Sequence, residues 1–186
     1  MTVWALSDSH FRHAMVAEKR GFESRDAHDE HIIASVNRLV KPDDILWHMG
    51  DVGLGKDEEI LEYAARLNGR KQLITGNHDR SWPGDRDSRK VQKRWLEVFE
   101  SVQAFARTRF SGVPVLLSHF PYHGDHTVNE RHTQYRLRDE GAWLLHGHTH
   151  SSDKGGKDHM IHVGLDAWGL KPVSEGEIAS MIAKAS

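Results

Sequence analysis

Short apolar and β-branched runs recur along the chain, and each one predicts a strand. They occupy residues 2–6, 45–49, 72–75, 113–118, 142–146 and 159–163. Apolar side chains at helical spacing predict helices at residues 29–40, 57–67, 91–99 and 175–184. Strands and helices alternate through the first half of the chain, so we expect parallel strands joined by helical crossovers there. The second half is richer in strands. The pattern indicates an α/β protein with two packed sheets flanked by helices.

Two long segments, 80–94 and 121–140, are polar and weakly patterned. We expect surface loops or short helices there, and such segments often border functional sites. Segment 80–94 is rich in arginine and lysine. These side chains form either a basic rim beside a site, with Trp82 available to stack on a base, or a solvated helix face; we favour the helix face.

Composition narrows the class of protein. The length suits a single domain over residues 1–186, and 38% apolar with 28% charged residues is typical of a folded globular protein. A net charge of −2 gives no strong nucleic-acid signature. No apolar run approaches the roughly 20 residues that cross a bilayer, and the first residues do not resemble a secretory signal. The absence of cysteine excludes disulfides and thiolate metal sites, and it fits the cytoplasmic location that we expect.

Histidine is unusually frequent, with 15 residues. We expect ten of them to be structural, although His123 and His126 could line a pocket because their segment starts just after His119. Without cysteine, a metal site must use imidazole, carboxylate and amide groups, which suit Mn²⁺, Fe, Co, Ni or Zn.

Ligand-type residues follow five of the predicted strands. In chain order they are Asp8 and His10, Asp51, Asn77, His119, and His148 with His150. The carboxyl ends of strands in an open α/β sheet form the edge at which ligands bind, so we expect these side chains to meet. Residues two apart on extended chain point to the same side, which lets each spaced pair aim at one centre.

Seven candidate ligands exceed the three or four that a single catalytic zinc takes. A natural division is two metal ions that share one carboxylate, a recurring solution for displacement at phosphorus. We therefore expect two divalent metal ions, with Mn²⁺ as the first choice and Fe, Ni, Co or Zn as alternatives.

The ordered motifs Asp-x-His, Gly-Asp, Gly-Asn-His-Asp, His and Gly-His-x-His, which run from residue 8 to residue 150, resemble the calcineurin-like metallophosphoesterase superfamily. The resemblance implies a four-layer α/β/β/α sandwich of two mixed sheets flanked by helices. It implies that Asp8, His10 and His150 hold one metal ion, that Asn77, His119 and His148 hold the other, and that Asp51 bridges them.

The same resemblance assigns roles to His78 and Asp79. His78 faces the phosphate and donates to an oxygen or to the leaving group, and Asp79 orients His78. The nucleophile is a hydroxide that bridges the two metal ions, whose charges lower the pKa of the bound water. The expected reaction is hydrolysis of a phosphoester.

The segment after Gly50–Asp51 lacks the arginine with which the protein phosphatases of this superfamily grip phosphate. The sequence is more similar to small bacterial and phage members that cleave phosphodiesters, including 2′,3′-cyclic nucleotides. We expect a phosphodiesterase acting on a small phosphoester or nucleotide. The alternatives are a phosphomonoesterase on small phosphorylated metabolites or nucleotides and, less favoured, a non-catalytic metal-binding scaffold. The sequence does not set the oligomeric state.

Overall fold

The computed structural model describes residues 1–185, which form two five-stranded sheets and five α-helices. The first part of the chain contains β1 (Val3–Leu6), α1 (Ala14–Lys19), α2 (Arg25–Asn37), β2 (Ile45–His48), α3 (Asp57–Ala65), β3 (Arg70–Ile74), α4 (Ser88–Trp95) and β4 (Ser101–Gln103). The second part contains β5 (Phe105–Phe110), β6 (Val113–Ser118), β7 (Leu144–His146), β8 (Gly155–Lys157), β9 (Met160–His162), β10 (Val173–Ser174) and α5 (Glu175–Ala185). Two short 3₁₀ helices lie at Thr133–Tyr135 and Leu165–Trp168.

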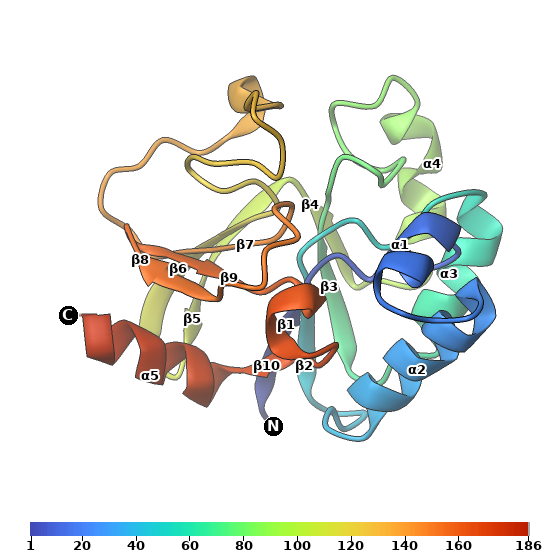
Figure 1. The fold of residues 1–186 in the computed structure, drawn as a ribbon, viewed down its shortest axis with the longest axis horizontal. Coiled ribbons are helices and arrows are strands. Elements are labelled where there is room, and N and C mark those ends of the chain that lie inside the picture. Colours follow the sequence, from blue (N-terminus) through green and yellow to red (C-terminus); the bar gives the residue numbers. More distant parts are fainter. Residues whose placement is uncertain (186) are drawn as a thin grey trace.

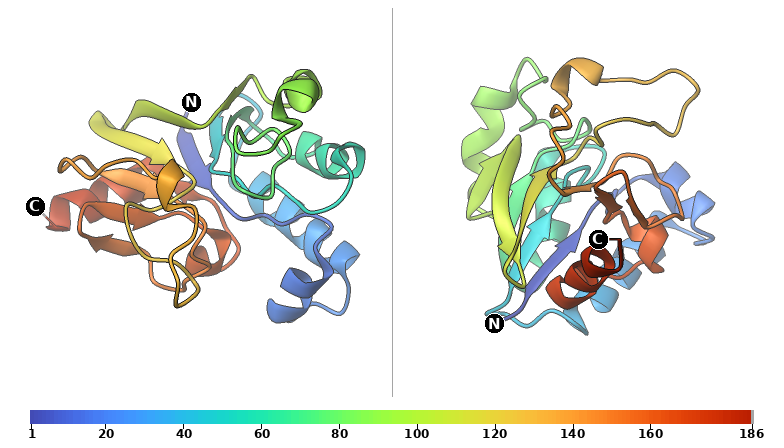
Figure 2. Two further views of the ribbon diagram at one scale, coloured as in Figure 1. Left: turned by 90° about the horizontal axis from the view of Figure 1, so that it is seen from above. Right: turned by 90° about the vertical axis from the view of Figure 1, so that its left-hand side faces the viewer.

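Both sheets are mixed, as predicted. The first sheet has the order β10-β1-β2-β3-β4, in which β1 to β4 are parallel and β10 is antiparallel to β1. The second has the order β5-β6-β7-β9-β8, with parallel β6, β7 and β9 between antiparallel edge strands. Helices α1 to α4 lie on one side of β1, and α5 lies with the second sheet on the other (Figures 1 and 2). The observed architecture confirms the predicted α/β fold class.

Successive side chains of the parallel strands point to opposite faces of the first sheet, so the interior is divided into two cores. In β3, Leu73 packs with the helices of the first sheet, whereas Ile74 faces the second sheet. The first core gathers side chains such as Ile32 of α2, Ile60 of α3 and Trp95 of α4. Because the first sheet is covered on both faces, its central strands β1, β2 and β3 end in apolar runs that the sequence analysis identified, whereas its edge strands β4 and β10 were not predicted.

Register places the carboxyl ends of the central strands side by side. Leu6 pairs with His48, and His48 pairs with Leu73, so β1, β2 and β3 end almost level. The two sheets also meet at this edge. Ser7 donates its backbone N–H to the carbonyl of Val163 at 3.1 Å, just beyond β1 and β9. Residues that follow strands of both sheets are therefore delivered to one place.

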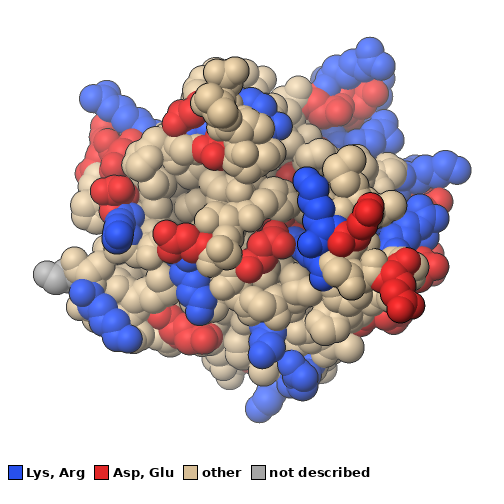
Figure 3. All heavy atoms as spheres, viewed as in Figure 1, with Lys and Arg blue, Asp and Glu red and all other residues tan. Residues whose placement is uncertain are grey.

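Several boundaries differ from the sequence prediction. Helix α2 begins at Arg25 rather than at residue 29, because the Ser24 hydroxyl caps it by accepting from the backbone N–H of Ala27 at 3.1 Å. Segment 80–94 contains all of α4 except its last residue, Trp95, and segment 121–140 is a loop apart from its 3₁₀ turn. Within residues 1–185, no helix combines the length and the apolar character that crossing a membrane requires. Acidic and basic side chains are interspersed over the face shown in Figure 3.

Candidate metal centre

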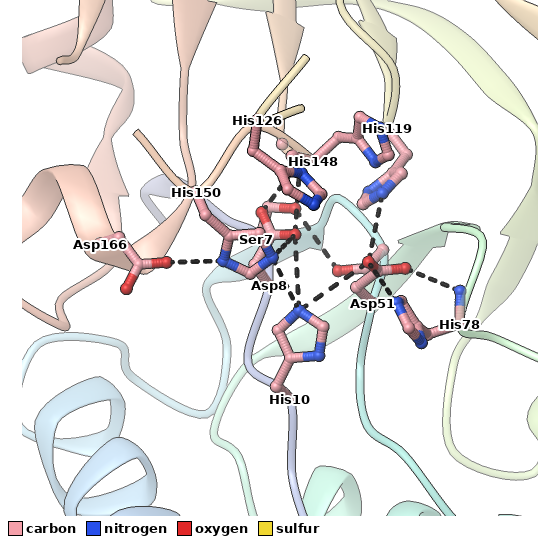
Figure 4. A network of polar contacts seen from close by, with 12 residues as sticks. Ser7, Asp8, His10, Asp51, His78, His119, His126, His148, His150 and Asp166 are labelled. Carbon is pink, nitrogen blue, oxygen red and sulfur yellow. Dashed lines mark hydrogen bonds and ion pairs between the residues drawn. The ribbon is translucent and has the colours of Figure 1, made fainter. Parts of the chain in front are cut away.

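The seven predicted ligands follow strands of both sheets. Figure 4 labels all of them except Asn77 and shows the labelled side chains gathered at one place. The first sheet supplies Asp8, His10, Asp51 and Asn77, and the second supplies His119, His148 and His150. Most of them are buried: Asp8, His10, Asp51, His119 and His148 are at most 2% exposed. The fold thus brings polar side chains, separated by up to 142 positions in the chain, into one buried group.

Asp8, His10 and His150 form the first part of this group. Their potential ligand atoms lie within 4.8 Å of one another. The Nε2 atoms of His10 and His150 face each other at 3.2 Å, and each lies 3.9 Å from Asp8 Oδ1. Two imidazole nitrogens and a carboxylate oxygen that converge in this way match a divalent cation site.

Asp51, His119 and His148 form the second part, and their potential ligand atoms also lie within 4.8 Å of one another. Asp51 also faces the first part, because its Oδ2 lies 3.4 Å from His119 Nε2 and 3.8 Å from His10 Nε2. Its other oxygen, Oδ1, accepts from the backbone N–H of His78 at 2.9 Å. A single carboxylate therefore stands between the two parts.

Buried atoms without partners support the fit to metal ions. Asn77 Oδ1 and His119 Nε2 are both buried and have no hydrogen-bond partner among the described residues. Such groups are costly unless something satisfies them. Amide oxygen, carboxylate and imidazole are suitable donors for divalent first-row metals, so the residues present fit a pair of cations.

Hydrogen bonds at the far side of three imidazoles decide which nitrogen remains free. His119 Nδ1 lies 2.8 Å from the carbonyl of Met49, His150 Nδ1 lies 3.0 Å from Asp166 Oδ2, and His148 Nε2 lies 3.3 Å from Asp125 Oδ2. Each ring then offers its other nitrogen to the centre. This arrangement is common behind metal-binding histidines, where it fixes both tautomer and ring orientation.

Sequence reasoning missed Asp166, which lies in the 3₁₀ helix after β9. Arg20, only 5% exposed in its side chain, binds both oxygens of Asp166, with Nε at 2.8 Å and Nη2 at 2.9 Å. Arg20 Nη2 also donates to the backbone carbonyl of Asp8 at 2.8 Å. The pair thus supports His150 and Asp8 together. Asp166 follows a strand at the ligand edge, so the rule that selected the seven ligands could have found it.

Asp125 was also missed, and it comes from loop 121–140. Its side chain is fully buried, and it accepts from Arg131 Nη2 at 3.1 Å and from the backbone N–H of Arg131 at 3.0 Å. Arg136, which is 4% exposed, lies 3.7 Å away. Nothing in the local sequence distinguishes Asp125 from an ordinary turn aspartate.

His78 and Asp79 occupy different surroundings. The His78 side chain is 37% exposed, and its Nε2 lies 3.9 Å from Asp51 Oδ2. Asp79 is buried, and its carboxylate accepts backbone N–H groups from Gly76, Asp51 and Val52 at 2.8–3.0 Å. Asp79 therefore joins the loops that follow β2 and β3. Its expected action on the His78 ring stays a prediction.

Burial lowers the pKa values of the histidines at the centre, and nearby carboxylates raise them. Burial lowers the pKa of His10 to about 3 and that of His148 to about 4, despite nearby carboxylates. Burial opposes the charge on His119 as well, but Asp51 and Asp8 outweigh it and raise the pKa of His119 to about 9. At neutral pH the first two rings are therefore neutral, the form that binds a metal, whereas His119 carries a proton.

Backbone conformation at the centre is unusual. Five of the predicted ligands have positive φ: Asp8 at 62°, His10 at 50°, Asp51 at 54°, His148 at 71° and His150 at 50°. The chain also approaches itself closely at Gly147, where an added Cβ would lie 2.6 Å from Asp8 Oδ2 and nearer still to Ser7 Oγ. Tight turns after the strands thus aim the ligands inward.

A cleft of about 500 Å³ opens beside the centre. His10, His78 and His150 line it, together with residues of α1 and of loop 121–140. His126 lines it as well, whereas His123 lies at a different hollow of the surface. No described residue of segment 80–94 lines this cleft. Trp82 instead contacts Tyr135 edge-on and Phe120 with the two rings tilted.

Comparisons with known proteins agree with the fold. The model of the calcineurin-like phosphoesterase superfamily domain matches residues 1–165. The chain is 43% identical to the gene 66 protein of Mycobacterium phage D29 (93% of this chain, 92% of that one) and 40% identical to that of phage L5 (96% and 93%). A solved protein of unknown function from Aquifex aeolicus has a TM-score of 0.73 and 25% identity, over 97% of this chain and 98% of that one. The chain therefore belongs to the calcineurin-like phosphoesterase superfamily and is a hydrolase that acts on phosphoesters.

Proposed function

We propose that this enzyme hydrolyses phosphodiesters, 2′,3′-cyclic nucleotides among them, at a centre of two divalent metal ions. The position of Asp51 carries the proposal, because its Oδ2 faces His119 at 3.4 Å and His10 at 3.8 Å. One oxygen shared by two groups of ligands is what a dinuclear site requires.

The residues divide between the two ions as the family resemblance implies. Asp8, His10 and His150 would hold one ion, Asn77, His119 and His148 the other, and Asp51 both. The bound cations supply an activated water and neutralise charge that develops on the phosphate. Mn²⁺ is our first choice, since imidazole and oxygen donors without thiolate suit it.

His78 is the proposed proton donor to the leaving group. Its imidazole is partly exposed in the cleft, 5.3 Å from the ring of His10, while its backbone N–H is fixed by Asp51. A group placed beside the reacting phosphate can deliver a proton as the P–O bond breaks. Asp79 supports this position by holding the loop that carries His78.

The choice of diester over monoester rests on charge. Val52, Gly53, Leu54 and Gly55 follow Asp51, so no arginine from this segment reaches the phosphate. A monoester dianion has more charge to neutralise than a diester, and a forked guanidinium is the usual partner for it. A phosphomonoesterase is the second candidate, because the same donor set can serve both reactions.

A substrate panel tests the proposal. Metal-stripped protein is reconstituted with Mn²⁺ and assayed on bis(p-nitrophenyl) phosphate, p-nitrophenyl phosphate and 2′,3′-cyclic AMP. We expect faster hydrolysis of the two diesters, and faster hydrolysis of the monoester would reverse the order. Asp51→Ala should lose both metal ions, and two ions per chain in that variant would exclude the shared carboxylate.

A further inference from the structure

The cleft beside the metal centre extends past the groups that the proposed reaction uses. Helix α1 lies on one side of the centre and loop 121–140 on another (Figures 1 and 2). The α1 wall contributes Met15 and Lys19, and the loop contributes His126 and Arg131. A cleft of about 500 Å³ has room for more of the substrate than one phosphate.

The charged residues that line this cleft are unbalanced. They are Lys19, Arg20, Arg131 and Asp166. Arg20 and Asp166 neutralise each other through two hydrogen bonds. Lys19 makes no ion pair with any described residue. Arg131, on the opposite wall, shares the single carboxylate of Asp125 with Arg136, so that carboxylate offsets only one of the two arginine charges. A locally cationic cleft on a chain with net charge −2 favours an anionic ligand.

Arg131 is held in one orientation by its neighbours. Its Nη2 lies 3.1 Å from Asp125 Oδ1 and 3.0 Å from His126 Nε2, and the buried Asp125 carboxylate is itself anchored by Arg136. Nη1 of Arg131 makes no hydrogen bond within residues 1–185, and the side chain is 41% exposed. The arginine is therefore fixed by one amino group and can donate with the other.

The same contacts argue against a third metal ion. Asp125, His126 and His148 could by distance hold a cation. However, Arg131 Nη2 already lies within hydrogen-bond distance of both Asp125 and His126, so a positive charge is in place. The group is better described as the support of an arginine than as a metal site.

We propose that Arg131 forms a subsite for a second phosphate, and that the substrate is a short nucleotide phosphodiester carrying a phosphate beyond the one that is cleaved. The inference rests on the proposed phosphodiesterase function. Nη1 of Arg131 binds the second phosphate, and Lys19 adds positive potential from the α1 wall. Asp125 and His126 stand between Arg131 and His148, which separates this subsite from the cleaved phosphate.

The test compares dithymidine phosphate, TpT, with the same dinucleotide bearing a terminal phosphate on its 5′ or its 3′ end. We expect one phosphorylated form to have a kcat/KM about tenfold higher than TpT, the effect of a charge-assisted hydrogen bond. Arg131→Gln should bring this ratio close to one. The ratio compares two substrates on one variant, so any weakening of the Asp125 contact with His148 lowers the rates on both substrates alike and cancels in the ratio. Arg138→Gln, on the same loop but 88% exposed and absent from the cleft, should change neither the ratio nor the rates.

An unchanged ratio in Arg131→Gln would overturn the subsite. An equal loss on TpT and on the phosphorylated forms would also overturn it, because Arg131 would then contact the cleaved phosphate. Calorimetry provides a readout without turnover: wild type should bind thymidine 3′,5′-bisphosphate more tightly than either monophosphate, and Arg131→Gln should not. If no diester were hydrolysed, the proposed function would fail while this binding comparison still decided the subsite.

Discussion

Asp166→Asn tests whether the carboxylate behind His150 is needed for one of the two metal ions. Asp166 Oδ2 lies 3.0 Å from His150 Nδ1, and both oxygens accept from Arg20. Asparagine keeps the shape of the side chain but removes its charge and one acceptor. The His150 ring then loses the partner that fixes its orientation, and Arg20, which also holds the Asp8 carbonyl, loses its counter-charge.

We expect Asp166→Asn to weaken the binding of one metal ion strongly and that of the other only slightly. Replacing the carboxylate behind a metal-binding histidine usually weakens metal affinity by about 10–100-fold, or about 1.4–2.8 kcal/mol. The loss should fall on the ion that Asp8, His10 and His150 hold. The side-chain contacts of Asp166 within the described part of the chain are with His150 and Arg20, not with His119, so the other ion should bind within about threefold of its wild-type affinity.

The assay is calorimetric titration of Mn²⁺ into the metal-free protein, with both affinities fitted. Asp43→Asn is the matched control, because it removes one exposed carboxylate at the opposite end of β2. Wild-type affinity at both ions in Asp166→Asn would refute the argument. Equal weakening of both ions would show a general disturbance, which thermal unfolding of the metal-free variant would reveal independently.

Three further predictions concern proton transfer, packing and pH. His78→Ala should retain both metal ions but lower kcat by about 10²–10⁴-fold, and full activity would contradict its role as proton donor. Gly147→Ala places a Cβ against Asp8 and Ser7, so it should cost about 1–3 kcal/mol in urea unfolding and lower the metal content. Because the pKa of His119 is about 9 in the metal-free protein, metal binding at neutral pH must release its proton, and affinity should rise with pH until about that value. Calorimetry in buffers with different ionisation enthalpies measures this release, and affinity independent of pH from about 6 to 8 would contradict it.

The central strands of the first sheet, β1 to β3, were predictable because burial on both faces leaves apolar runs in the sequence. The strands that were missed lie at edges or are very short. In β5, exposed and half-buried residues alternate from Phe105 onward, and Gly155–Lys157 has no apolar residue at all. Helix α1 has only six residues, and its cap is the unusual His13. Their pairing is set by neighbours in space, which local patterns do not encode.

At the metal centre, too, some residues could be predicted from local sequence and others only from the folded structure. The candidate ligands could be selected from sequence because each follows a strand, and parallel strands deliver their ends to one edge. The residues that orient them could not all be selected in this way. Asp125 acts through a loop fold that depends on Arg131 and Arg136, and Arg20 reaches Asp166 across 146 positions of the chain. Long-range ion pairs of this kind appear only when the chain is folded.

The left-handed backbone conformation of five candidate ligands affects which substitutions stabilise the protein. A residue other than glycine in that conformation costs roughly 1 kcal/mol or more, even though aspartate and histidine tolerate it better than most. Glycine at Asp51 or His148 would relax the backbone while removing a ligand. Selection for thermal stability alone, without selection for activity, would therefore favour glycine substitutions that remove metal ligands. We expect a highly stable but inactive relative of this enzyme to carry glycines at these turns.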